Sequence, residues 1–207
     1  MEIKKVLVIG AGQMGGGIAQ VFAQSGFEVL LNDAYPEAID KRLEFIDGLL
    51  TKSVTKGKIS EEDKKNTLDN LKVCKDLNEA KDVDLVVEAI IENVEIKGKV
   101  ITQLNDILRD DVIFATNTSS LPITELASFY KKPENYIGMH FFNPVPVMTL
   151  VEIIRGIATS DETYQAIHDM TLKIGKHPVM VNDVPGFVSN RVLQVMINEA
   201  ISCVDHG

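Results

Sequence analysis

Short apolar runs alternate with longer segments of helical periodicity along most of this chain. Runs with strand character occupy residues 5–9, 27–33, 71–74, 84–90, 112–116 and 136–140. Segments with helical character occupy residues 13–25, 36–56 and 94–108, and another helix should follow Ser60, which with Asp63 has the pattern of a capping box. Strands and helices in alternation predict a parallel sheet that is covered by helices on both faces.

The pattern changes after residue 140. Strand-like runs at 147–154 and 178–181 flank a helix with Ser160 as its expected N-cap, and a last helix should follow Pro185-Gly186 and extend to Gly207. No later element is present against which this last helix could pack. We therefore expect one domain at residues 1–184, and at residues 185–207 the first helix of a C-terminal helical domain that continues beyond this chain.

Composition narrows the class of protein. The 207 residues are 45% hydrophobic and 25% charged, as in ordinary globular proteins, and no apolar stretch is long enough to span a membrane. The net charge of −9 argues against nucleic acid as a partner. Cys74 and Cys203 form no spaced pair, so we expect neither a disulfide framework nor a metal site. The first strand begins too early to leave room for a signal peptide, and a reducing cytoplasm is the expected location.

Basic residues concentrate in one part of this acidic chain. Seven of the 21 lysines and arginines fall between Lys41 and Lys65, in the long second helix and the segment after it. Such a cluster is either a solvated helix face or a binding surface for an anionic substrate, and charge pattern alone leaves both interpretations open.

A glycine-rich turn, Gly10-Ala11-Gly12-Gln13-Met14-Gly15, joins the first strand to the first helix. In this setting Gly10 makes the tight turn, Gly12 lets the backbone approach a pyrophosphate, and Gly15 lets helix and strand pack closely. The helix N-terminus adds free N–H groups for the phosphates. These features predict a Rossmann-like, doubly wound α/β fold, although a glycine-rich turn without a ligand is the alternative. Gly16 and Gly17 continue into the helix, where close packing or a nearby ligand should explain them.

Asp33 selects among the possible dinucleotides. It ends the second strand, 18 residues after Gly15. A carboxylate at this place accepts hydrogen bonds from the ribose hydroxyls and repels a 2′-phosphate. We therefore predict NAD, and not NADP, as the cofactor.

His140 is the candidate for proton chemistry. It ends the strand at 136–140, and ligands collect beyond the carboxyl ends of parallel strands. Glu152 lies twelve residues later within an apolar strand, and a buried carboxylate needs a partner, for which His140 is the obvious candidate. A carboxylate-held histidine is well suited to moving a proton near neutral pH. An exposed acid on an edge strand is the alternative for Glu152, and its apolar same-face neighbours Leu150 and Ile154 argue against it.

Other polar residues follow strands at the same predicted edge. Glu92 follows the strand at 84–90, and Asn117-Thr118-Ser119-Ser120 follows the strand at 112–116. Asn117 and Ser119 either face the same cleft as His140 or only cap a helix near Pro122. The other histidines are weaker candidates for catalysis. His168 is expected on a helix surface, His177 in a loop before a proline, and His206 is next to the last residue.

Several motifs resemble one enzyme family. They are GAGQMGGGIAQ at the start, VEAIIE at 87–92, TNTSSLPIT at 116–124, GMHFFNPVPVMTLVEIIRG at 138–156 and DVPGFVSNR at 183–191. The chain resembles the short-chain L-3-hydroxyacyl-CoA dehydrogenases over its whole length, and within them the bacterial 3-hydroxybutyryl-CoA dehydrogenases. This resemblance implies an NAD-dependent oxidoreductase of fatty acid and butanoate metabolism that acts on an acyl-CoA thioester.

The resemblance also implies a role for individual residues. His140 would be the general base, Glu152 would orient its imidazole, and Ser119 and Asn190 would hydrogen-bond the substrate's oxygens. The cofactor would be held by Gly10, Gly12, Gln13, Met14, Gly15, Asp33, Glu92, Lys97 and Asn117. The CoA moiety would lie near Lys52, Ser53 and Lys56.

The family continues into a helical C-terminal domain that encloses the acyl-CoA and forms much of a dimer interface. We therefore expect the full-length form to be a homo-oligomer, and this chain to bind NAD but turn over acetoacetyl-CoA poorly. A dehydrogenase of a free hydroxy acid or sugar acid is one alternative. A non-catalytic, NAD-binding structural relative is another.

Overall fold

A mostly parallel eight-stranded sheet forms the centre of the computed structural model, which describes residues 3–207. The strand order is β3-β2-β1-β4-β5-β6-β7-β8, and only the β6–β7 pair is antiparallel. The strands are β1 (Lys5–Ile9), β2 (Glu28–Asn32), β3 (Leu71–Val73), β4 (Leu85–Glu88), β5 (Ile113–Thr116), β6 (Tyr136–Phe141), β7 (Leu150–Arg155) and β8 (His177–Asn182). Strands β1 to β6 follow the order of a dinucleotide-binding sheet, so the predicted Rossmann-like fold is confirmed.

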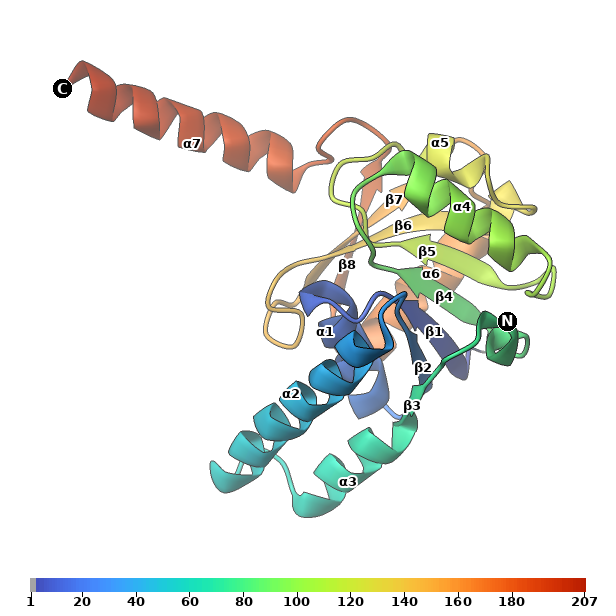
Figure 1. The fold of residues 1–207 in the computed structure, drawn as a ribbon. Coiled ribbons are helices and arrows are strands. Elements are labelled where there is room, and N and C mark those ends of the chain that lie inside the picture. The colour runs from blue at the N-terminus through green and yellow to red at the C-terminus, as the bar shows by residue number, and fades with distance from the viewer. Residues whose placement is uncertain (1–2) are drawn as a thin grey trace.

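Helices cover both faces of this sheet (Figure 1). The helices of the described chain are α1 (Gln13–Gln24), α2 (Pro36–Thr55), α3 (Glu61–Asn70), α4 (Val94–Asn105), α5 (Ile123–Ala127), α6 (Asp161–Lys173) and, away from the sheet, α7 (Ser189–His206), with short 3₁₀ helices η1 (Leu77–Ala80) and η2 (Pro133–Asn135). Apolar side chains of α1, α2 and α6 join one core cluster, and those of α4 and α5 join a second. The buried strands carry apolar residues on both faces, because each face has its own helical layer.

Local signals in the sequence account for several element boundaries. Gly26, with φ +86°, follows the end of α1, and Gly57, with φ +66°, follows the end of α2. Ser60 and Asp63 form the expected capping box of α3, and the Ser160 side chain accepts from Thr163 N at the start of α6. Only glycine adopts a left-handed conformation readily, so these two glycines end helices efficiently.

Two expectations near β7 and β8 are wrong. The strand expected from residue 147 begins at Leu150, because Val147 N and Met148 N donate to Pro144 O and form a turn instead. His177, expected in a loop, is the first residue of β8, since its N–H donates to Thr149 O at 2.8 Å and starts the pairing with β7.

Helix α7 extends away from the sheet (Figure 1). It has no buried residue, although Val192, Val195, Ile201 and Val204 are apolar. Its first residues, in contrast, return to the end of β6, where the polar residues of the candidate site gather. None of the helices described between residues 3 and 207 combines the length and apolar character that crossing a membrane requires.

Candidate active site

The glycine-rich turn has the geometry that a bound pyrophosphate requires. Gly10 has φ +102°, and a Cβ on Gly15 would lie 1.8 Å from Gly10 O, so the close contact of helix and turn excludes any side chain there. A Cβ on Gly12 would meet nothing within 4 Å. The packing of the protein therefore does not require glycine at position 12, and the open space above the N-terminus of α1 fits a ligand's phosphates. Gly12 is also the N-cap and offers no side-chain acceptor to the first N–H groups.

Asp33 is held beside this turn. It follows β2, and its Oδ2 accepts from Ala11 N at 2.7 Å while its Oδ1 accepts from Tyr35 N at 2.9 Å. The carboxylate thus lies next to the phosphate turn, as binding of an adenosine ribose requires. The turn and Asp33 together fit NAD.

Close packing explains the next two glycines. A Cβ on Gly16 would collide with the side chain of Arg42, 2.2 Å from its Cδ, and one on Gly17 would lie 2.9 Å from the Cβ of Val145. Arg42 crosses α1 here to donate to Ala11 O at 3.0 Å. Of the two expected explanations, close packing is confirmed at both positions.

His140 and Glu152 form a buried pair. They are direct cross-strand partners of β6 and β7, with His140 Nδ1 at 2.8 Å from Glu152 Oε2. His140 is 7% exposed and Glu152 is 2% exposed, so the predicted partner of the buried carboxylate is confirmed. The rings of Phe142 and Phe187 lie 4.7 and 5.8 Å from the imidazole, centroid to centroid.

The second oxygen of Glu152 has partners that the sequence did not suggest. Oε1 accepts from Ser189 N at 2.9 Å and Ser189 Oγ at 2.8 Å, and from Val188 N at 3.3 Å. Burial raises the pKa of Glu152, but the hydrogen bonds from His140 and from Ser189 outweigh it and hold the pKa below its usual value. Glu152 is therefore an ionised carboxylate at neutral pH.

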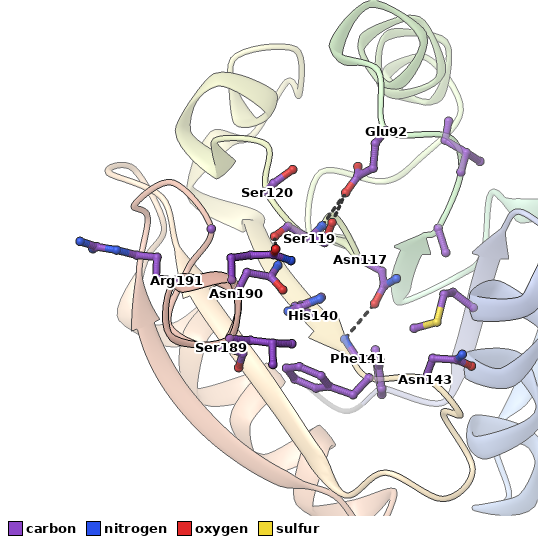
Figure 2. Close-up of a pocket in the computed structure, with 17 residues that line it drawn as sticks. Glu92, Asn117, Ser119, Ser120, His140, Phe141, Asn143, Ser189, Asn190 and Arg191 are labelled. Carbon is purple, nitrogen blue, oxygen red and sulfur yellow. Dashed lines mark hydrogen bonds between the residues drawn. The ribbon is translucent and has the colours of Figure 1, made fainter. Parts of the chain in front are cut away.

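A cavity of about 760 Å³ opens beside His140. Figure 2 shows that its polar side chains converge from the ends of separate elements around the imidazole. With Nδ1 bound to Glu152, Nε2 is the imidazole nitrogen left for a ligand. The cavity is lined by Met14, Glu92, Asn117, Ser119, Ser120, His140, Phe142, Asn143, Ser189, Asn190 and Arg191, among others.

The loop after β5 is fixed from three sides. Glu92 accepts from Thr118 Oγ1 at 2.9 Å and from both N and Oγ of Ser119. Asn190 Nδ2 donates to Ser119 O at 3.0 Å, and Asn117 Oδ1 accepts from Phe141 N at 2.8 Å (Figure 2). The loop thereby connects β4, β6 and α7 at the cavity.

These residues do not cap a helix. The N-cap of α5 is Pro122, without a side-chain hydrogen bond, and Asp183 accepts from the N–H groups of Ile123 and Thr124. The alternative interpretation of Asn117 and Ser119 as helix caps is therefore wrong, and both line the cavity.

Lys97 lies behind the cavity wall. It is 1% exposed, and its Nζ lies 2.6 Å from Glu88 Oε1 and 3.4 Å from Glu92 Oε2. Glu88, on β4, also accepts from Thr116 Oγ1 at 2.8 Å. Sequence reasoning missed Glu88, although an acid in the apolar run of β4 was a signal of the kind that identified Glu152.

Of the basic residues between Lys41 and Lys65, Arg42 lines a second cavity, whereas the lysines are exposed or paired with acids. Ser53 also lines this second cavity of about 460 Å³ between α1, α2 and the β6–β7 loop, whereas Lys52 and Lys56 are exposed and do not line it. Asn143 lines both cavities, so the two adjoin at this residue. Lys64 and Lys65 pair with Asp47 and Asp69 at 2.8 and 2.6 Å, as on a solvated helix face. Gln13 also lines this second cavity.

The other histidines lie elsewhere. His168 contacts Asp169 on α6, at 3.1 Å, and His177 and His206 are exposed, so none of the three lines the cavity. In the described part of the chain, no cluster of His, Cys, Asp and Glu is arranged to hold a metal ion.

Comparisons with known proteins agree on one family. Residues 5–184 match the family described as "3-hydroxyacyl-CoA dehydrogenase, NAD binding domain". A probable 3-hydroxybutyryl-CoA dehydrogenase of Bacillus subtilis is 50% identical over 207 residues, which are 100% of this chain and 72% of that protein. A 3-hydroxybutyryl-CoA dehydrogenase of Clostridioides difficile is 47% identical over 98% of this chain and 72% of its own length. The crystal structure of (S)-3-hydroxybutyryl-CoA dehydrogenase from Ralstonia eutropha superimposes with a TM-score of 0.97 at 42% identity, over 100% of this chain and 73% of that one.

Proposed function

The chain belongs to the 3-hydroxyacyl-CoA dehydrogenase family, and we propose that it interconverts 3-hydroxybutyryl-CoA and acetoacetyl-CoA with NAD as hydride carrier. The buried His140–Glu152 pair at the cavity is the observation that carries this proposal. The names of the relatives support the substrate, and the phosphate turn with Asp33 supports the cofactor.

His140 is the proposed general base. NAD, held by the turn at Gly10–Gly15 and by Asp33, would supply the acceptor for the hydride that leaves C3 of the alcohol. His140 Nε2 removes the proton of the 3-hydroxyl, because a ketone forms only when the oxygen loses its proton as the carbon loses hydride. Glu152 holds Nδ1, fixes the tautomer and stabilises the imidazolium that results. In the reverse direction the imidazolium returns the proton to the forming alkoxide.

Ser119 and Asn190 are the proposed contacts to the substrate's oxygens. Both line the cavity, and both are held in place, Ser119 by Glu92 and Asn190 by its bond to Ser119 O. The Asn190 amide keeps a second N–H for the substrate, and the Ser119 hydroxyl would turn its proton from Glu92 to the substrate on binding. A preorganised donor such as Asn190 stabilises developing charge on oxygen better than a mobile one.

The proposed cofactor contacts come from the glycine-rich turn, from Asp33 and from the first cavity. They are Gly10, Gly12, Gln13, Met14, Gly15, Asp33, Glu92 and Asn117. Lys97 would act on the cofactor site through Glu92.

The CoA moiety is proposed to lie in the second cavity. This cavity meets the first at Asn143 and contains Ser53, and an acyl thioester can therefore extend from His140 toward α2. Lys52 and Lys56, on the exposed end of α2, would supply positive charge near the phosphates.

Domain organisation, assembly and location are proposals as well. We propose an NAD-binding domain at 1–184 and the first helix of a C-terminal helical domain at 185–207, with the full-length form a homo-oligomer through that domain. The family match over 5–184 and the exposed apolar residues of α7 support this division. The free thiols of Cys74 and Cys203 support a cytoplasmic location.

Oxidation of NADH tests the function directly. Acetoacetyl-CoA should support turnover and free acetoacetate should not. The rate should be low with this chain alone and higher with the chain fused to the C-terminal part of a longer relative. His140→Gln should abolish turnover and keep NADH affinity, whereas the control His168→Gln on α6 should change neither. Absence of any thioester rate in both forms would contradict the proposal, and a rate with the free acid alone would favour a hydroxy acid dehydrogenase.

A further inference from the structure

The turn between β8 and α7 has an unusual backbone. Gly186 and Phe187 both have positive φ, +75° and +52°, in succession. For phenylalanine this left-handed conformation is unfavourable, so the surrounding structure must enforce it. Phe187 is 1% exposed and its ring packs against the His140 imidazole at 5.8 Å. Strain of this kind at a site is a reason to ask what the turn positions.

The turn delivers donors to Glu152. Immediately after Phe187, the N–H groups of Val188 and Ser189 and the Ser189 hydroxyl all point to Glu152 Oε1, at 3.3, 2.9 and 2.8 Å. The other oxygen, Oε2, contacts His140 Nδ1 at 2.8 Å. The two carboxylate oxygens are thus divided between the imidazole and the start of α7, and this division fixes the rotation of the carboxylate.

The Ser189 hydroxyl does not serve the helix itself. The N-cap of α7 is Val188, which makes no side-chain capping hydrogen bond, and the hydroxyl of Ser189 instead donates to a strand 37 residues away in sequence. A carboxylate at a helix N-terminus also benefits from the helix dipole. Glu152 therefore occupies the place of an anion bound at the N-terminus of α7.

We propose that Ser189 is a positioning residue of the proposed reaction: through its hydroxyl and amide it holds the Glu152 carboxylate aimed at His140. The expected effect on turnover rests on the proposed function, whereas the contacts between Ser189 and Glu152 do not. The Glu152 carboxylate connects the start of α7 to the His140 imidazole. A displacement of this end of the helix would therefore change the orientation of His140 without any direct contact between the two.

Among the described residues, His140 is the charged or titratable partner recorded for the Glu152 carboxylate. His140 faces it from β6, and the residue that faces it from β8 in the ladder is the apolar Val179. From α7 it meets the neutral Ser189. Burial raises the pKa of Glu152, whereas the bonds from His140 and Ser189 lower it. Because Ser189 lowers the pKa of Glu152, removal of its hydroxyl should raise that pKa.

Carboxyl-carbon NMR of the ¹³C-labelled chain measures this shift without requiring turnover. Ser189→Ala should move the Glu152 titration midpoint to higher pH, and Ser189→Thr, which keeps a hydroxyl, should return it toward the original value. Ser202, near the other end of the same helix, has its hydroxyl beside His206 and not Glu152, so Ser202→Ala is the matched control and should leave the midpoint unchanged. An unchanged midpoint in Ser189→Ala would overturn the proposal, as would the same shift in Ser202→Ala.

Turnover tests the consequence separately. In Ser189→Ala, kcat/KM for acetoacetyl-CoA should fall about three- to tenfold on the acid side of the pH profile, because one charge-assisted hydrogen bond is lost. The loss should shrink as pH rises, since Glu152 is then ionised in both forms. A loss that is equal at every pH would indicate a structural role only and refute positioning. If the NMR midpoint shifts but neither this chain nor the fused chain turns over a thioester, the proposed function is rejected while the contact between Ser189 and Glu152 stands.

Discussion

Replacing Lys97 with methionine should destabilise this chain far more than its position beneath a cavity wall would suggest. The ammonium is 1% exposed and lies 2.6 Å from Glu88 Oε1, and Glu88 is 0% exposed. Methionine fills a similar volume, so little packing is lost. The substitution instead leaves the Glu88 carboxylate buried without its cation, and an uncompensated buried charge is costly.

The magnitude follows from the partners that remain. Removal of one member of a buried ion pair costs about 3–5 kcal/mol. Glu88 keeps two donors, Thr116 Oγ1 at 2.8 Å and Ile90 N at 2.7 Å, so we expect the lower end of that range, about 3 kcal/mol. With a urea dependence of about 2 kcal/mol per molar, the midpoint of unfolding should fall by about 1.5 M.

Urea unfolding followed by circular dichroism provides the assay, and a double-mutant cycle isolates the pair. Glu88→Gln in the Lys97→Met background removes the unpaired charge and should recover about 2 kcal/mol. Lys65→Met is the matched control, because Lys65 lies 2.6 Å from Asp69 with both side chains well exposed. That substitution should leave the free energy of unfolding unchanged, since solvent screens an exposed pair.

Two results would refute the reasoning. Equal effects of Lys97→Met and Lys65→Met on the free energy of unfolding would mean that burial does not distinguish the two ion pairs. A double-mutant cycle without coupling would mean that Glu88 does not depend on Lys97.

Lys97→Met should also affect cofactor binding. Burial raises the pKa of Glu92, but the backbone hydrogen bond from Ser119 and the positive charge of Lys97, together with the hydroxyls of Thr118 and Ser119, lower it below its usual value. NADH should therefore bind Lys97→Met more weakly at mildly acidic pH than at pH 8, relative to the parent chain.

Two further predictions concern the cofactor and the thiols. Asp33→Ala should lower the affinity for NADH about tenfold or more, because the ribose hydroxyls lose a charged acceptor. The ratio of NADH to NADPH affinity, measured by fluorescence titration, should also fall. An unchanged ratio would contradict the assignment of Asp33. Burial raises the pKa of Cys74 to about 11, so a disulfide reagent at pH 8 should label the exposed Cys203 first and Cys74 only in urea, and rapid labelling of Cys74 in the native chain would contradict its burial.

Much of this fold was predictable because its signals are local. The buried strands, the turn at Gly10 to Gly15 and the capping box at Ser60 all depend on neighbours within a few residues. The start of β7 was not predictable from apolar character, because Val147 and Met148 are apolar but belong to a turn that Pro144 O organises. Apolar sequence indicates burial or strand propensity, whereas the hydrogen-bond partners decide where the ladder begins.

Buried carboxylates mark the limit of prediction at the site. An acid in an apolar strand, such as Glu152 or Glu88, indicates that some partner exists, since an unpaired buried charge is not tolerated. The partner of Glu152 could be inferred because His140 lies only twelve residues earlier at the end of a strand, and the antiparallel pairing of β6 and β7 then makes the two residues direct neighbours. Lys97 and Ser189 could not, because each reaches its carboxylate from the start of a helix whose placement depends on the whole sheet. A sequence can thus state that a buried charge must be satisfied, but which helix end satisfies it is a property of the topology.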